Sequence, residues 1–132
     1  MAYGDINVGD SITGECTISD DMVRDFAKLS GDYNPIHVDD EFAKKSLFKN
    51  RIAHGLLTIA ASSPYFFELC GYNYVLVNID LAFLKPVYIG ETFSTTVRIL
   101  EKLEKQRLKV DIEASVGERI VGKGTLIAQY IG

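Results

Sequence analysis

The chain has 132 residues, of which 47% are hydrophobic and 24% charged, and its formal net charge is −4. That length fits a single domain over residues 1–132 with enough apolar surface for a core, and the composition excludes a disordered tail. The 14 basic residues stand against 18 acidic ones and form no long basic block, so we expect no nucleic-acid partner.

The cysteines and the apolar segments indicate the compartment. Cys16 and Cys70 lie far apart, so they suit a reducing environment as small core side chains and cannot form a zinc site alone. The N-terminus lacks the features of a signal peptide, and the most apolar stretch, residues 55–70, is too short and too interrupted to span a bilayer. We therefore expect a cytoplasmic protein with no membrane partner.

The first part of the chain mixes short apolar segments with turn residues. A strand is expected over residues 11–18. A helix follows, with Ser19 where an N-cap belongs and Gly31 as the stop. A short helix, capped by an aspartate, is expected around residues 41–45.

A second apolar segment has a different pattern. Residues 55–61 predict a helix that is hydrophobic nearly all the way round, which indicates burial. Pro64 falls inside the same pattern and predicts a kink or a break, because proline removes one backbone donor and crowds the preceding turn.

After about Asn73 the chain reads as strand. Alternating apolar residues predict three or four antiparallel strands, each with one buried face. The first of these faces is expected to carry Val75, Val77, Ile79, Leu81 and Phe83. Turn signals separate the strands at residues 88–90, 104–105 and 117–118. The economical arrangement is an α+β fold in which a curved sheet wraps around one central helix.

Both histidines of the chain lie in one segment with an aspartate. Asp32 and His37 flank the turn Asn34-Pro35, in which the proline fixes its own φ and keeps Asn34 extended. A rigid turn can hold a carboxylate and an imidazole within reach of one water or one substrate atom. This pair suits general acid–base catalysis near neutral pH, which typically accelerates a reaction by about 10²–10⁴-fold.

Other interpretations of these residues are open. Asp32 is also an ordinary turn residue, and His37 could be a half-buried histidine whose ring bonds a backbone carbonyl. His37 and His54 with Asp32 or Asp39 are residue types that bind zinc or iron, but their spacing matches no usual ligand motif. We expect no metal. His54 could simply fix the turn before the apolar helix.

Gly55 begins that helix, where unpaired backbone N–H groups and the positive end of the helix dipole converge. Because glycine has no side chain, a ligand carbonyl can approach the backbone closely, and these amides suit negative charge developing on an oxygen. The alternative is a glycine that allows tight packing of helix against sheet.

At these residues the sequence resembles a known family. Residues 30–37 (Ser-Gly-Asp-Tyr-Asn-Pro-Ile-His) followed by 53–57 (Ala-His-Gly-Leu-Leu) resemble the hydratase signature of MaoC-like dehydratases. This family contains the (R)-specific enoyl-CoA hydratases and the (3R)-hydroxyacyl-carrier-protein dehydratases. Residues 81–92 are also typical of the family, and the resemblance covers nearly the whole chain.

The resemblance implies a hot-dog fold, in which a long antiparallel sheet wraps around a central helix. It also implies a homodimer, with a heterodimer as the alternative. Asp32 and His37 would be the catalytic pair, and the Gly55 amide would hold the thioester oxygen. Asn34, in the turn, and Ser63, at the position of a serine that supports the aspartate in some members, would be supporting residues.

The implied reaction adds water across a trans-2-enoyl thioester to give the (R)-3-hydroxyacyl thioester, or runs in reverse as a dehydration. Asp32 and His37 would bind the same water, with Asp32 as the expected base. The reaction needs no metal or redox cofactor, only the CoA or acyl-carrier protein that carries the acyl group.

Two other functions stay open. An acyl-CoA thioesterase would keep the fold and cleave the thioester instead, although the arrangement of Asp32 and His37 around the Asn-Pro turn favours a hydratase. A non-catalytic acyl-thioester-binding or regulatory subunit is the second alternative. Because this chain has both residues, it would be the catalytic member of any mixed pair.

Overall fold

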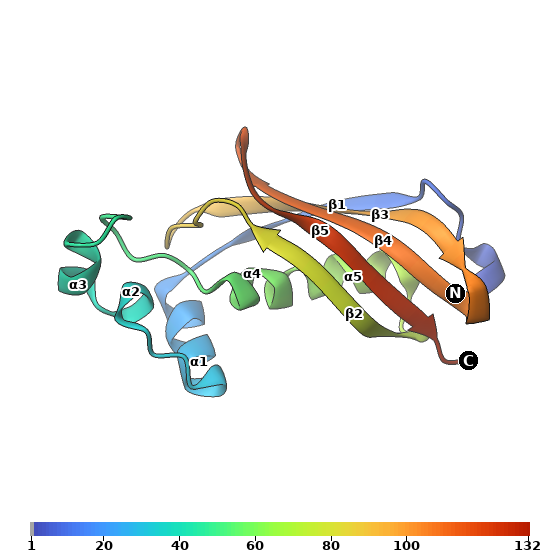
Figure 1. Ribbon diagram of the computed structural model, residues 1–132, viewed down its shortest axis with the longest axis horizontal. Coiled ribbons are helices and arrows are strands. Elements are labelled where there is room, and N and C mark those ends of the chain that lie inside the picture. The colour runs from blue at the N-terminus through green and yellow to red at the C-terminus, as the bar shows by residue number, and fades with distance from the viewer. Residues whose placement is uncertain (1) are drawn as a thin grey trace.

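Over residues 2–132, the part of the chain that the structure describes, five strands form one antiparallel sheet in the order β1-β3-β4-β5-β2. In this computed structural model, α4 and α5 lie along one face of the curved sheet (Figure 1). The strands are β1 (Ser11–Thr17), β2 (Tyr74–Phe83), β3 (Thr92–Leu103), β4 (Arg107–Val116) and β5 (Arg119–Tyr130).

The helices fall into two groups. Near one end of the sheet lie α1 (Asp20–Ser30), α2 (Pro35–Val38) and α3 (Asp40–Lys44), and against its face lie α4 (Gly55–Ala61) and α5 (Ser63–Cys70) (Figure 1). Two short 3₁₀ turns are η1 (Tyr3–Asp5) and η2 (Glu104–Gln106). Among residues 2–132, no helix is both long enough and apolar enough to cross a membrane.

Local capping explains where the first helices begin and end. The Ser19 hydroxyl accepts a hydrogen bond from the N–H of Met22 at 3.1 Å, and Gly31 ends α1 in the left-handed region at φ 77°. Asp39 caps α3 by accepting from two backbone N–H groups. The predicted break is also confirmed, since α4 ends at Ala61 and Pro64 occupies the first turn of α5.

Two clusters of buried side chains form the core. The first packs α5 and the start of β2 against the inner face of the sheet, and it contains Phe66, Cys70, Tyr74, Leu108, Val110, Ile112 and Leu126. The second joins α1 and α4 to the other end of the sheet, and it contains Val23, Leu57, Val87, Phe93, Ala114 and Val121. Burial raises the pKa of the Cys70 thiol to about 12, as expected for a core cysteine, whereas Cys16 is only partly buried.

The expected inner face of β2 holds for Ile79, Leu81 and Phe83 but is wrong before the bulge, at Val75. A bulge at Val77 shifts the register, so that Leu76 pairs with Ala128 but Asn78 pairs with Ile127. Val75 therefore lies on the opposite face from Ile79, because one extra residue reverses the alternation. β2 is also an edge strand, and Val77 and Ile79 are 47% and 50% exposed.

Candidate active site

The turn before α2 is built by its own side chains. The Asn34 side-chain oxygen accepts from the N–H of Ile36 at 3.2 Å and so caps α2, while Asn34's own N–H donates to Asp32 Oδ1 at 3.1 Å. Pro35 occupies the first helical position, where its missing N–H costs nothing. Asn34 thus links the Asp32 carboxylate to the short helix that carries His37.

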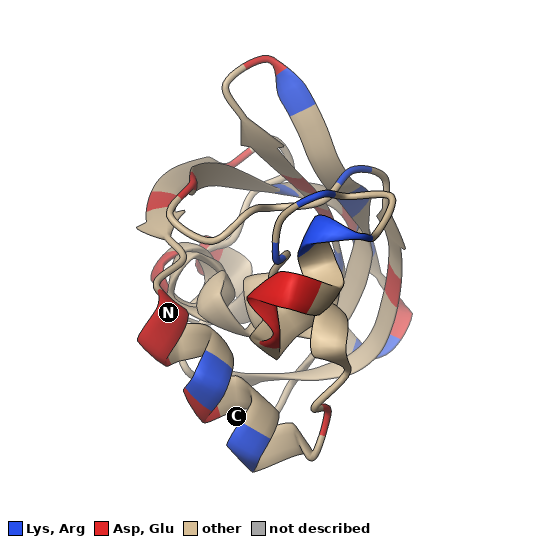
Figure 2. Cartoon of the chain, turned by 90° about the vertical axis from the view of Figure 1, so that its left-hand side faces the viewer, with Lys and Arg blue, Asp and Glu red and all other residues tan. Residues whose placement is uncertain are grey.

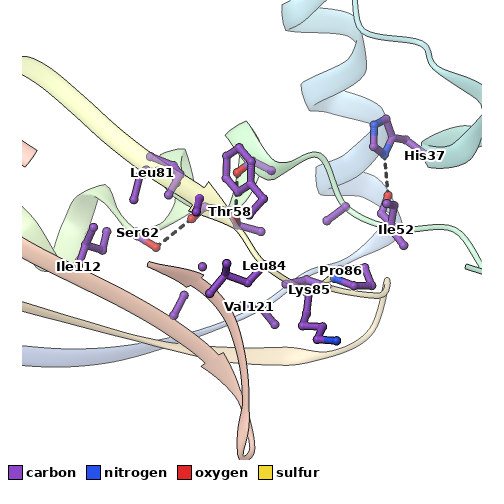
Figure 3. Close-up of a pocket in the computed structure, with 18 of the residues that line it drawn as sticks. His37, Ile52, Thr58, Ser62, Leu81, Leu84, Lys85, Pro86, Ile112 and Val121 are labelled. Atoms are coloured by element: carbon purple, nitrogen blue, oxygen red, sulfur yellow. Dashed lines mark hydrogen bonds between the residues drawn. The ribbon is translucent and has the colours of Figure 1, made fainter. Parts of the chain in front are cut away.

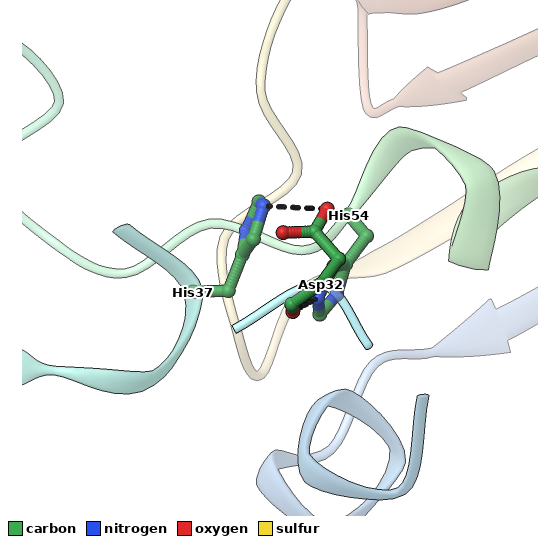
Figure 4. Close-up of side chains that lie close together, drawn as sticks. All are labelled: Asp32, His37 and His54. Atoms are coloured by element: carbon green, nitrogen blue, oxygen red, sulfur yellow. Dashed lines mark hydrogen bonds and ion pairs between the residues drawn. The ribbon is translucent and has the colours of Figure 1, made fainter. Parts of the chain in front are cut away.

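Asp32 and His37 face each other, as Figure 4 shows. His37 Nε2 lies 3.9 Å from Asp32 Oδ2, and His37 Nδ1 lies 2.8 Å from the carbonyl oxygen of Ile52. A carbonyl can only accept, so Nδ1 carries the proton and the neutral ring presents a bare Nε2. At 3.9 Å the carboxylate and Nε2 form no direct hydrogen bond, but both acceptors lie within reach of the two hydrogens of one water.

Burial favours the neutral form of His37. The residue is 9% exposed, and loss of solvation is the largest effect, lowering its pKa below the ordinary 6.5. The hydrogen bond to Ile52 and the charge of Asp32 act in the opposite direction, and His54 lowers the pKa further. His37 is therefore neutral near pH 7 and can accept a proton.

His54 supports both members of the pair. Its Nε2–H donates to the backbone carbonyl of Asp32 at 3.0 Å, and its ring stacks on the His37 ring with centroids 3.9 Å apart. The Phe26 ring covers it at 5.0 Å. His54 is 2% exposed, and among the described residues its Nδ1 has no hydrogen-bond partner. The interpretation of His54 as a turn residue therefore missed its contacts with both catalytic candidates.

Asp32, His37 and His54 also place possible ligand atoms within 4.8 Å of one another. A metal ion lies along the in-plane lone pair of each imidazole that binds it. The two rings are stacked with only 27° between their planes, so their lone pairs do not converge on one point. This arrangement suits packing better than shared coordination.

An apolar cavity of about 310 Å³ opens beside His37 (Figure 3). It lies between α4, β2 and the inner face of the sheet, and His37 and Gly55 line one part of it. Its apolar walls include Ile52, Ile59, Leu81, Phe83, Ile112 and Val121. A cavity of this size with few polar groups suits the hydrocarbon part of a small ligand.

Gly55 is the first residue of α4, where a backbone N–H has no partner within the helix. Its neighbour in space is the ring of Phe83, and a Cβ added at Gly55 would lie 2.8 Å from that ring. The missing side chain therefore allows close packing of the Phe83 ring on the start of α4, which was the alternative interpretation of Gly55. Sequence spacing did not indicate Phe83, because it lies on a different element.

Ser63, expected as a supporting residue, does not line the cavity beside His37. It is the exposed first residue of α5 and lines a smaller cavity of about 30 Å³ with Phe66 and Phe67. The preceding Ser62 is buried instead, and its hydroxyl bonds the Thr58 carbonyl at 2.8 Å and the Thr95 hydroxyl at 2.9 Å. Ser62 lines both cavities, so it stands between them.

Several known proteins are similar to this chain in sequence. Residues 8–119 match the family described as MaoC like domain. The (R)-specific enoyl-CoA hydratase of Rhodospirillum rubrum is 36% identical over 124 residues, which cover 92% of this chain and 86% of that protein. The 3-hydroxybutyryl-CoA dehydratase of Methylorubrum extorquens is 33% identical over 131 residues, 98% of this chain and 83% of the other.

Solved structures of other proteins have the same fold as this chain. The (R)-hydratase from A. caviae involved in PHA biosynthesis has a TM-score of 0.90 at 25% identity, covering 95% of this chain and 97% of that one. The ChsH1-ChsH2 complex from Mycobacterium tuberculosis has the same fold, with a TM-score of 0.84 at 14% identity over 94% and 98% of the two chains. The fold is thus the α+β hot-dog fold, as expected. The chain belongs to the MaoC-like domain family.

Proposed function

We propose that the protein is a hydro-lyase that adds water to trans-2-enoyl thioesters to give (3R)-hydroxyacyl thioesters, or catalyses the reverse dehydration. The observation that carries this proposal is the pairing of Asp32 Oδ2 with the bare Nε2 of His37, 3.9 Å apart, beside an apolar cavity. Two proton acceptors at one point suit the activation of a water molecule. The activities of the two enzymes named above support the same chemistry.

The acyl chain would occupy the apolar cavity, and the thioester oxygen would approach the Gly55 N–H. Asp32 and His37 would hold a water at the β-carbon. As the water oxygen bonds to that carbon, one of its protons passes to the pair, and the π electrons move to give an enolate on the thioester. The Gly55 amide stabilises the oxygen that takes up this charge.

In the second step the pair gives the proton it took from the water to the α-carbon, which completes the addition of H and OH across the double bond and regenerates the pair. The carbon skeleton gains one water and no electrons, so the equation balances without a redox cofactor. We propose that no metal is needed either, and that CoA or an acyl-carrier protein carries the acyl group.

The test is hydration of crotonyl-CoA by the purified protein, followed by loss of the enoyl absorbance and by product chirality. Asp32→Asn and His37→Gln are each expected to lower kcat by about 10²–10⁴-fold, because each removes a proton acceptor. Asp25→Asn, at an exposed position on α1, is the matched control and should keep full activity.

Release of free thiol without an (R)-3-hydroxy product would identify a thioesterase and contradict the proposal. Full activity in both Asp32→Asn and His37→Gln would show that the pair is not catalytic. If no enoyl thioester from four to about twelve carbons reacts on either carrier, the protein is a binding subunit instead.

We also propose a homodimer formed through β2. This strand is at the edge of the sheet, with unpaired backbone groups along one side, and it exposes the apolar side chains of Val75, Val77 and Ile79. Such an edge is a template for pairing with another strand, and exposed apolar residues favour its burial. Ile79→Asp should therefore dissociate the dimer in sedimentation experiments. Val8→Asp, exposed in the loop before β1, should leave it intact.

The two cysteines give information on the cellular compartment of the protein. Cys16 and Cys70 are unpaired within the described chain. This supports a reducing compartment, and we propose the cytoplasm. Cell fractionation with an antibody against the protein would test that location.

A further inference from the structure

We propose that Arg51 is a positioning residue that holds His37 in its reactive geometry. This rests on the proposed function, in which His37 must present Nε2 toward Asp32. Arg51 lies 14 residues from His37 in the chain and does not touch the catalytic carboxylate, so any effect on the reaction would act through His37.

The guanidinium of Arg51 holds three elements together. Nη1 donates to the main-chain carbonyl of His37 at 3.1 Å, Nη2 donates to Asp20 Oδ1 at 2.7 Å, and Nε donates to Asp40 Oδ1 at 2.9 Å. Asp20 begins α1, His37 is in α2 and Asp40 begins α3. The Arg51 side chain is only 10% exposed, whereas the side chains of Asp20 and Asp40 are 46% and 81% exposed, so the guanidinium is buried and its carboxylate partners face solvent.

The next residue fixes the ring of His37. The Ile52 carbonyl accepts the Nδ1–H bond that leaves Nε2 bare, and the Ile52 N–H donates to the carbonyl of Ile36 at 3.2 Å. Arg51 and Ile52 thus hold α2 at three points: the Ile36 carbonyl, the His37 carbonyl and the His37 ring.

The same segment is joined to the body of the molecule. Ile52 forms a bridge with Tyr88, and the N–H of Ala53 donates to the carbonyl of Val87 at 2.8 Å. α2 has only four residues, too few to keep its shape without tertiary contacts. The position of His37 relative to the cavity therefore depends on the segment that begins with Arg51.

A lysine cannot make the same contacts. The planar guanidinium directs its donors to three oxygens at once, whereas an ammonium group on a flexible stem holds fewer of them in fixed geometry. Figure 2 views the molecule from the end with α1, α2 and α3, and it shows acidic and basic segments close together there. The hydrogen bond from Arg51 is the largest effect that lowers the pKa of Asp20, so this pair stays charged.

Loss of Arg51 should change how His37 titrates. The charged and titratable groups that face His37 are Asp32, His54 and Arg51, with Asp20 and Asp40 held behind Arg51. Burial is the main effect that lowers the His37 pKa, so loosening α2 and admitting water moves that pKa up toward its ordinary value. The acidic limb of kcat/KM then moves to higher pH.

The test compares Arg51→Met and Arg51→Lys with Arg24→Met. Arg24 is a matched control, because its Nε binds the same Asp20 at 3.0 Å. Its Nη2 makes only a long contact of 3.5 Å, to the carbonyl of Val38 at the end of α2, and it contacts neither the ring nor the carbonyl of His37. Arg51→Met is expected to lower kcat by about 10- to 100-fold with little change in KM, the loss that a misplaced catalytic group produces. Arg51→Lys should recover part of that loss, and Arg24→Met should match the wild type.

Imidazole ¹⁵N NMR gives a second readout that does not depend on turnover. The chain has two histidines, so each ring can be followed separately. The His37 titration should move to higher pH in Arg51→Met and stay unchanged in Arg24→Met. If Arg51 only stabilised the fold, Arg51→Met would lower the free energy of unfolding but would shift neither the His37 titration nor the acidic limb of kcat/KM.

Each outcome decides the inference. Wild-type kcat and an unshifted His37 titration in Arg51→Met would overturn it, as would an equal loss in Arg24→Met. If Arg51→Met does not fold, Arg51→Lys decides alone, since its kcat must fall below that of Arg24→Met. If the wild type hydrates no enoyl thioester, the proposed function fails, but the NMR shift still tests the contact between Arg51 and His37.

Discussion

Two substitutions at His54 separate its hydrogen bond from its ring. His54→Phe keeps an aromatic ring against His37 and Phe26 but removes the Nε2–H that donates to the Asp32 carbonyl. His54→Gln keeps a donor in nearly the same place but removes the ring. If His54 positions Asp32 through this hydrogen bond, His54→Gln should be the more active variant and His54→Phe the more stable one.

The contacts of His54 set the expected stabilities. His54→Phe loses one hydrogen bond, worth about 0.5–1.5 kcal/mol, and removes the buried unpaired Nδ1, which returns about 1–3 kcal/mol. The larger ring offsets part of this gain in a close-packed site, so the free energy of unfolding should stay within about 1 kcal/mol of wild type. His54→Gln loses two aromatic pairs, worth about 0.5–1.5 kcal/mol each.

The assay pairs urea unfolding at one fixed protein concentration with hydration of crotonyl-CoA. His54→Phe should lower kcat by about 10- to 100-fold, because the Asp32 loop loses its anchor. Phe26→Leu, which removes a ring partner of His54 without touching Asp32, is the control and should keep its kcat. Wild-type kcat in His54→Phe, or a lower kcat in His54→Gln than in His54→Phe, would refute this reasoning.

Two further predictions concern pH and chain length. The pKa of His37 is lowered in the folded protein, chiefly by burial, so the unfolded chain binds the proton more readily. The contribution of neutral His37 to the free energy of unfolding should be fully present above about pH 6.5 and decrease as the pH falls toward the pKa of the folded state. Urea unfolding between about pH 5 and 8 should show this slope, and His37→Gln should flatten it; an equal slope in both proteins would contradict the assignment. Ile112 lines both cavities and is 4% exposed, so Ile112→Ala should join them and raise kcat/KM for long enoyl chains relative to crotonyl-CoA, at a cost of about 2–5 kcal/mol in stability. An unchanged ratio would place the end of the acyl chain elsewhere.

Local chemistry made much of the fold predictable. The Ser19 cap and the Gly31 stop bound α1, and the apolar run from Gly55 to Ala61 is α4. These features depend on residues within a few positions of one another, and so does the rigid turn that joins Asp32 to His37. The candidate pair could therefore be predicted from the sequence, because only four residues, one of them a proline, separate Asp32 from His37.

The face of β2 could not be predicted in the same way. Alternation of apolar residues does not reveal a bulge, and the bulge at Val77 reverses which side chains face inward. The sequence also does not show which strand lies at the edge of the sheet. Strand order is decided by pairing between distant segments, and it leaves Ile79 half exposed rather than buried.

The surroundings of the pair were decided by tertiary structure alone. His37 is held by Arg51 and Ile52, 14 and 15 residues further along the chain, and Asp32 by the His54 ring, 22 residues further along. No short motif encodes such contacts, because they exist only once the helices pack together. The sequence by itself determined which groups can do the chemistry, and the tertiary structure decided how those groups are oriented and kept neutral or charged.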